Sequence, residues 1–170
     1  MKAQLPYPKN LIASLVFIFV IATIGCNKIH IFPKAVPPAL PAETHVGKKT
    51  FGFNLNGQLW LPNTAGPDAG PALTSYLQFN SFTLAANRLN QHITFNIPNV
   101  TSTGSYDLTT NVNVAIFFSD TTRYKCTQGT MDITYFDGQK GIISGIFSMK
   151  AASPAGNEVT IDQGRFDMTF

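Results

Sequence analysis

Charge is scarce in this sequence of 170 residues, in which Asp, Glu, Lys and Arg together make up 12%, about half of their usual share in globular proteins. The 12 basic residues outnumber the 9 acidic ones. Two of the basic residues, Lys2 and Lys9, precede the apolar segment 10–26, so the balance beyond it is nearly even. Because no basic cluster follows, the sequence lacks the electrostatic footprint of nucleic-acid binding, and we predict no nucleic-acid partner.

Catalytic and cofactor-binding motifs are missing as well. The sequence contains no G-x-S-x-G elbow, no HExxH and no phosphate-binding loop. His30 and His45 do not have the spacing of metal ligands, so we interpret them as solvated linker residues. We therefore predict no catalytic residue, no metal site and no cofactor. The acidic residues are scattered singly, which leaves a hydrolase site assembled in space as an alternative. They are Glu43, Asp68, Asp107, Asp120, Asp132, Asp137, Glu158, Asp162 and Asp167.

The longest hydrophobic run lies near the N-terminus, where residues 10–26 read NLIASLVFIFVIATIGC. Basic residues precede this run, and Gly25 and Cys26 close it, so the segment resembles the signal peptide of a bacterial lipoprotein. The resemblance implies cleavage after Gly25 and acylation of the Cys26 thiol and of the new amino group. A membrane-spanning anchor is the alternative, although residues 11–25 are shorter than the roughly 20 residues that span a bilayer.

These features divide the sequence into three parts. Residues 1–25 form the predicted signal peptide, residues 26–49 a lipidated cysteine with a Pro-rich linker, and residues 50–170 a single domain of ordinary size. Lipid on Cys26 predicts membrane attachment, and the lack of an acidic run directly after this cysteine favours the periplasmic face of the outer membrane. Cys126 is then left without a partner in the chain, and we predict a buried, unpaired thiol.

The dipeptide Asn56-Gly57 stands between two apolar runs in the segment FGFNLNGQLWLP. Asn-Gly is the strongest short hairpin signal, because both central residues of a type I′ turn need a positive φ angle. A two-residue turn pairs Phe53 with Trp60. We predict that Trp60, the single tryptophan of the chain, is a core residue, with a sugar-stacking platform as the alternative.

Apolar residues alternate with polar ones through most of the chain after residue 50, which is typical of half-buried β-strands. In the segment VNVAIFF, the residues Val112, Val114, Ile116 and Phe118 are predicted to form one inward stripe. The pattern predicts an all-β fold, an antiparallel β-sandwich or barrel of about nine to eleven strands. In the middle of the chain, strands are expected at 73–79, 82–86, 91–97, 106–108 and 112–118.

The last third of the chain has the clearest alternation. A long hairpin is predicted around Asp137-Gly138, with Met131, Ile133 and Tyr135 pointing into the core. In the final strand, Phe166, Met168 and Phe170 are expected to point inward. Arg165 and Asp167 then point outward together, and we expect them to form a surface ion pair, with a role in orienting a ligand as the alternative.

Three stretches, TFGFNLNGQLW, GIISGIF and IDQGRFDMTF, resemble a family of uncharacterised small all-β lipoproteins of Bacteroidota. The resemblance covers about residues 50–62 and 128–170. It implies a small all-β envelope lipoprotein of unknown activity, and it supplies no catalytic residue.

The sequence therefore favours a membrane-tethered envelope lipoprotein that acts as a non-enzymatic binding or structural module. Its expected partners are the membrane, through the lipid on Cys26, and a glycan or protein of the envelope. Two alternatives stay open: a periplasmic hydrolase with an acidic site assembled in space, and a subunit that assembles by strand exchange.

Overall fold

The computed structural model describes residues 38–63, 70–110 and 114–170, which form ten β-strands and no helix. No helix in these ranges is long and apolar enough to cross a membrane. The strands are β1 (Thr50–Leu55), β2 (Gln58–Trp60), β3 (Leu73–Gln78), β4 (Ser81–Arg88), β5 (Gln91–Ile97), β6 (Gly104–Asp107), β7 (Val114–Ser119), β8 (Thr122–Asp137), β9 (Ile142–Ala152) and β10 (Glu158–Thr169). The all-β prediction is confirmed.

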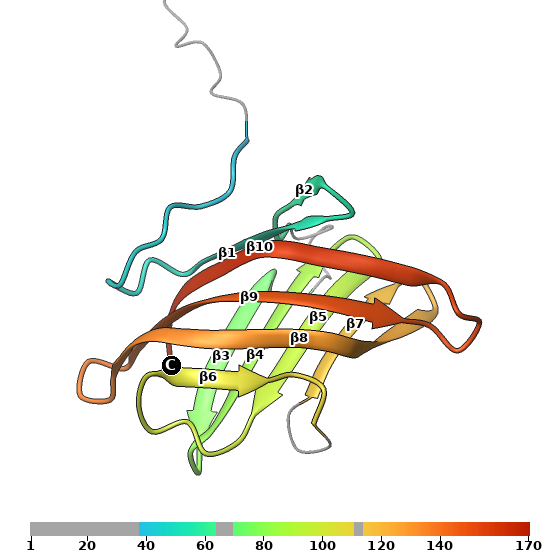
Figure 1. Cartoon of the computed structure of the whole chain (residues 1–170). Helices are drawn as coiled ribbons and strands as arrows, with labels where there is room; N and C mark the ends of the chain where they lie inside the picture. Colours follow the sequence, from blue (N-terminus) through green and yellow to red (C-terminus); the bar gives the residue numbers. More distant parts are fainter. Residues whose placement is uncertain (1–37, 64–69, 111–113) are drawn as a thin grey trace, which may run out of the picture. The chain divides into compact units, whose positions relative to one another are not determined.

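All ten strands belong to one antiparallel sheet with the order β2-β1-β10-β9-β8-β7-β5-β4-β3, and β6 pairs with β8 beyond the end of β7. The sheet curls into a half-barrel, so that β1, β10, β9 and β8 face β3, β4, β5 and β7 across the core (Figure 1). Its two ends approach each other at two points. The hydroxyl of Ser75 on β3 donates to the Thr169 carbonyl at 2.6 Å, and Asn63 forms an isolated parallel bridge with Arg88.

The Asn-Gly hairpin has the predicted geometry. Asn56 and Gly57 have φ angles of 50° and 78°, as a type I′ turn requires, and Phe53 pairs with Trp60. The Trp60 side chain is only 1% exposed, and its indole N–H donates to Oε1 of Gln91 at 2.8 Å. Trp60 is therefore a core residue, and its buried ring leaves no platform on which a sugar could stack.

Two Gly-x-Phe triplets interlock in the core where β9 pairs with β10. Gly145 pairs with Phe166, and Phe147 pairs with Gly164. Each phenylalanine ring occupies the space that a Cβ on the opposite glycine would fill: an added Cβ would lie 2.5 Å from the Phe147 ring at Gly164 and 2.8 Å from the Phe166 ring at Gly145. The glycines thus allow two large rings to lie flat across neighbouring strands.

The predicted inward stripe of β7 is wrong by one residue. Ala115 and Phe117 are buried, whereas Val114 is exposed and Ile116 and Phe118 are partly exposed. Both faces of this strand carry apolar side chains, so alternation alone does not choose between them. The pairing with β5 decides the orientation, because Phe95 and Ile93 already point into the core, and Ala115 and Phe117 lie opposite them. Val112, also assigned to the stripe, lies outside the described residues.

The predicted inward orientation of Tyr135 is also wrong. Met131 and Ile133 are buried as expected, but a β-bulge between Ile133 and Tyr135 adds one residue to β8. The extra residue turns Tyr135 to the outer face and Phe136 toward the core, where its ring stacks on Phe170 at a centroid distance of 5.7 Å. Sequence alternation does not reveal a bulge of this kind.

Candidate ligand-binding site at the open end of the half-barrel

At one end of the half-barrel, the inward-facing side chains change from apolar to polar between one inward position of a strand and the next. On β4 the inward residues Phe82, Leu84 and Ala86 are fully buried, and the next inward position is Arg88. Arg88 pairs with Gln91, and Gln91 pairs with Ser119, so three polar side chains from three strands form one layer above the core. A polar layer facing inward at the end of a barrel is a common arrangement in ligand sites.

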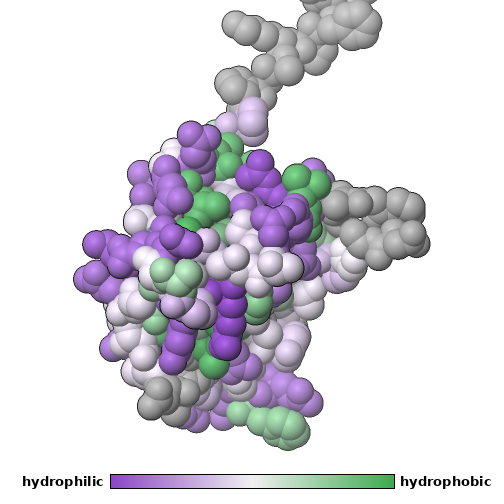
Figure 2. All heavy atoms as spheres, turned by 90° about the vertical axis from the view of Figure 1, so that its right-hand side faces the viewer, coloured by the Kyte–Doolittle hydropathy of each residue, from purple (hydrophilic) through white to green (hydrophobic). Residues whose placement is uncertain are grey.

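This polar layer forms the floor of a pocket of about 480 Å³, which we call the mouth pocket. Its walls come from the turns β1–β2, β4–β5 and β7–β8. On the side of the molecule that lies to the right in Figure 1, hydrophobic and hydrophilic residues are interspersed (Figure 2). The lining residues are Leu55, Asn56, Gln58, Leu59, Trp60, Arg88, Leu89, Asn90, Gln91, Ser119 and Asp120.

The mouth pocket contains one positive and one negative side chain. Arg88 is partly buried and donates from Nη1 to the backbone carbonyl of Leu59 at 3.2 Å. Asp120 is exposed and accepts a hydrogen bond from the Asn90 side chain. In the described ranges, the ion pairs are Lys140 with Asp137 and Arg165 with Glu43, so neither charged residue of the mouth pocket has a counter-ion there.

The rim of the mouth pocket is conformationally strained at Leu89. This residue occupies the β4–β5 turn with a φ angle of 51°, and its side chain is 67% exposed. A left-handed conformation costs a bulky residue roughly 1–2 kcal/mol, and exposure of a leucine adds no compensating burial. Phe79 in the β3–β4 turn has the same φ angle of 51° and is 94% exposed outside the mouth pocket, so it is the position of Leu89 in the pocket lining that makes it a candidate contact residue.

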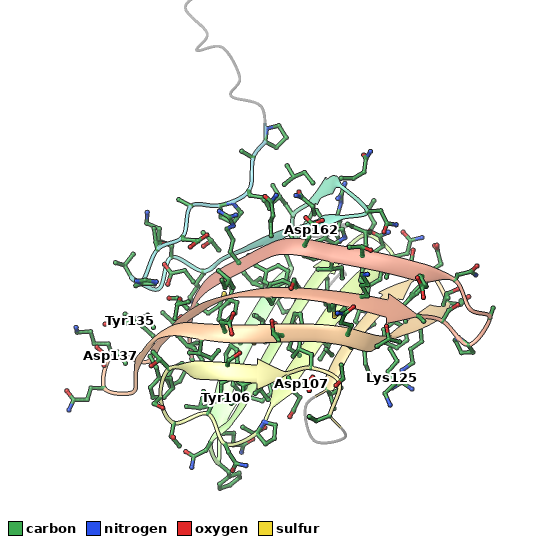
Figure 3. All side chains as sticks on the ribbon, viewed as in Figure 1. Tyr106, Asp107, Lys125, Tyr135, Asp137 and Asp162 are labelled. Atoms are coloured by element: carbon green, nitrogen blue, oxygen red, sulfur yellow. The ribbon has the colours of Figure 1, made fainter. Side chains whose placement is uncertain are left out.

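The aspartates of β6, β8 and β10 that are labelled in Figure 3 lie apart and do not form a catalytic pair of the kind that the hydrolase alternative requires. Asp107 on β6, Asp137 at the end of β8 and Asp162 on β10 lie at three separate places (Figure 3). Hydrogen bonds from the Thr109 backbone and hydroxyl lower the pKa of Asp107, and a backbone hydrogen bond from Lys140 lowers that of Asp137. Both carboxylates accept hydrogen bonds from backbone N–H groups two or three residues further along the chain, and so stabilise the adjacent turns. Asp68 lies outside the described residues.

A smaller groove on the outer face of β8, β9 and β10 does hold two acidic residues. Glu43, Asp132 and Arg165 line this groove, which has a volume of about 210 Å³. The carboxylate of Glu43 is exposed and pairs with Arg165 at 3.5 Å, an arrangement typical of a surface salt bridge. A glycosidase general acid instead sits in an apolar pocket, so the groove does not favour hydrolysis.

Asp167 does not form the expected ion pair with Arg165. Its side chain is only 1% exposed, because residues 38–48, which we call the strap, lie across the outer face of the sheet. The Asp167 carboxylate accepts hydrogen bonds from the Thr44 and Ser144 hydroxyls and from the backbone N–H groups of the strap. The strap donors are Val46 at 3.2 Å, Gly47 at 2.8 Å and Lys48 at 3.2 Å.

The histidine and cysteine side chains add no second site. His45 is exposed to solvent as expected, and its ring stacks on that of Tyr135 with a centroid distance of 5.3 Å. His92 lies on the outer face, its ring stacks on that of Phe118 at a centroid distance of 4.4 Å, and burial lowers its pKa. Cys126 is a free, buried thiol, as predicted, and burial raises its pKa, which disfavours the reactive thiolate.

Sequence reasoning missed Arg88, Leu89 and Gln91. A usable signal was present, because Arg88 continues the two-residue period of the buried residues on β4. A charged side chain at the inward position that ends a strand points into the barrel mouth. No group of His, Cys, Asp or Glu in the described ranges has the arrangement of a metal site. Cys26 and His30 lie outside those ranges.

Comparison with known proteins gives a family but no activity. One family model matches residues 50–168, which includes all ten strands except Thr169, the last residue of β10. No curated protein and no solved structure matches the chain.

Proposed function

The chain belongs to the family of that model, a domain of unknown function (DUF6252), and we propose that it is a lipid-anchored envelope protein whose half-barrel is a non-enzymatic binding module. The observation that carries the binding role is the mouth pocket. Its floor of Arg88, Gln91 and Ser119 replaces the apolar core residues at the point where solvent can enter. A small number of polar groups above an apolar base is the usual composition of a ligand site.

The anchoring half of the proposal rests on the sequence. Cys26 lies outside the described residues, and the support comes from the lipoprotein-like segment 10–26 and from the resemblance to lipoproteins of Bacteroidota. We propose attachment to the outer membrane on its periplasmic face. In this arrangement the lipid holds the domain at the membrane, and the mouth pocket takes a ligand from the envelope.

Affinity selection with a small-molecule extract of the cells that make the protein tests the binding role. We expect the full chain to retain at least one compound and to release it with unchanged mass. Gln58 is exposed and lines the mouth pocket, so Gln58→Trp should fill the pocket and abolish retention. The matched control is Gln139→Trp, in the exposed β8–β9 turn, which should retain the compound.

Three results would contradict the proposal. The first is an extract from which the wild-type chain enriches nothing. The second is equal retention by Gln58→Trp and wild type, which would place the site elsewhere. The third is release of a chemically altered compound by the wild-type chain but not by Gln58→Trp, because the half-barrel would then be an enzyme.

A further inference from the structure

We propose that the mouth pocket binds a monocarboxylate with an apolar portion, and that Arg88 holds its carboxylate group. This inference rests on the proposed binding role and names the chemistry of the ligand. It is carried by the placement of a guanidinium group, which has no counter-ion within the described residues, in one pocket with the leucine side chains of Leu55 and Leu89.

Arg88 retains most of its hydrogen-bonding capacity. A guanidinium has five N–H donors in a fork that matches a planar carboxylate. Of these donors, Nη1 bonds to the Leu59 carbonyl, and the remaining N–H groups have no acceptor within the described residues. The bond to Leu59 also fixes the direction of the side chain, so the guanidinium is positioned at the floor of the pocket before a ligand arrives.

The second charge in the pocket selects a monoanion over a dianion. Arg88 and Asp120 are the two charged lining residues, so the lining has no net charge. One carboxylate compensates Arg88, whereas a phosphate dianion brings an excess negative charge close to Asp120. Repulsion between this excess negative charge and the Asp120 carboxylate lowers the affinity for the dianion. The pocket therefore favours a ligand with one carboxylate.

The apolar portion is inferred from Leu89 and its neighbours. Leu89 is exposed at 67% in a left-handed conformation, in which an asparagine or glycine is the usual residue. Leu55 and Leu59 line the same pocket from the β1–β2 hairpin. A ligand chain that leaves the Arg88 floor beside the Leu55 and Leu89 side chains buries the exposed apolar surface of Leu89.

Isothermal titration of the full chain in detergent, with hexanoate, hexanamide and inorganic phosphate as probes, tests this inference. We expect hexanoate to bind about tenfold or more tightly than its neutral isostere hexanamide, because charge-assisted hydrogen bonds add that much affinity. Phosphate should not bind. Partitioning of the probe into detergent is the same for all variants of the chain, so differences between variants report on the pocket.

Two variants test the two parts of the inference. Arg88→Gln should abolish the preference for hexanoate over hexanamide, while its matched control Arg123→Gln, on an exposed residue outside the pocket, should keep it. Leu89→Asn is expected to fold, because asparagine accepts positive φ angles. It should lower the affinity for hexanoate severalfold and leave Arg88 in place, so the inference stays testable even if Arg88→Gln does not fold.

Several outcomes would overturn the inference. Equal affinities for hexanoate and hexanamide would show that the pocket does not recognise a carboxylate. Arg88-dependent binding of phosphate alone would show that the ligand is a different anion. Unchanged hexanoate affinity in both Arg88→Gln and Leu89→Asn would place binding outside the pocket. If the extract compound is lost in Gln58→Trp while hexanoate does not bind at all, the ligand class is wrong and the proposed function stands.

Discussion

Asp167 is a buried carboxylate whose hydrogen-bond donors come from two distant parts of the chain. Burial by itself raises the pKa of this group, but hydrogen bonds from Thr44, Gly47, Ser144 and Val46 outweigh that effect and lower the pKa from 3.8 to about 2. Donors more than 100 residues away in the sequence hold the carboxylate. Sequence alternation therefore placed Asp167 on the correct face of β10 but not its surroundings, since nothing in the local pattern indicates that the strap returns to cover it.

The lowered pKa leads to a prediction about stability. A carboxylate with a depressed pKa stabilises the folded state above its unfolded pKa of 3.8, and this contribution is lost as the pH falls toward 2. Asp167→Asn should lower the free energy of unfolding at pH 7 by about 2 kcal/mol. The gap to wild type should close between about pH 4 and pH 2, as urea denaturation over that range can show.

Asp132→Asn is the matched control for this experiment, because Asp132 is only partly buried and its carboxylate accepts no hydrogen bond within the described residues. It should change the free energy of unfolding by about 0.5 kcal/mol or less at either pH. An Asp167→Asn protein as stable as wild type at pH 7 would show that the charged hydrogen bonds between Asp167 and the strap do not stabilise the fold.

At the scale of single elements, local signals located turns and strands well and orientations less well. Asn56-Gly57 determines its own turn, because both residues adopt the positive φ angles that the turn needs. β7 was assigned the wrong face because Val114 and Phe117 are both apolar, and only the neighbouring strand distinguishes them. The bulge that reorients Tyr135 depends on the register of two paired strands, which a single strand does not encode.

The interlocked pairs of β9 and β10 predict an unusual response to alanine. Gly164→Ala should destabilise the protein by about 1–3 kcal/mol through overpacking, although alanine is normally preferred to glycine within a strand. In a Phe147→Ala background, where the opposing ring is gone, the same change should be neutral or stabilising. Thermal or urea unfolding of the two single variants and the double variant measures this coupling directly.

Gly70→Ala provides the comparison, since a Cβ at Gly70 meets no atom within 4 Å. It should leave the free energy of unfolding nearly unchanged. Additive effects of Gly164→Ala and Phe147→Ala would contradict the interlocked packing of β9 against β10.

At the scale of the whole molecule, the sequence predicted the fold class and the strand number better than the site. Alternation and turn residues repeat along the chain, so the all-β architecture follows from many independent local signals. The mouth pocket has no such redundancy. It depends on three turns, around residues 57, 89 and 120, that meet only when the sheet curls, and no motif in the sequence brings them together.

The proposed lipid anchor concerns the whole molecule, and a labelling experiment tests it. Metabolic labelling with an alkyne fatty acid should mark the wild-type chain and fail to mark Cys26→Ala, because the thiol that carries the lipid is then absent. Cys126→Ala, which removes the buried thiol, should label like wild type. Equal labelling of wild type and Cys26→Ala would show that the chain is held at the membrane in another way.

Hydrogen–deuterium exchange of the full chain tests most directly whether the open end of the half-barrel is a binding site. The exchange is measured with and without the compound retained from the cell extract. The account predicts slower exchange at residues 55–60, 88–91 and 119–120, the segments that line the mouth pocket, and unchanged exchange in the strap and along the outer face of β8, β9 and β10. Slower exchange confined to that outer face, or no change anywhere, would contradict it.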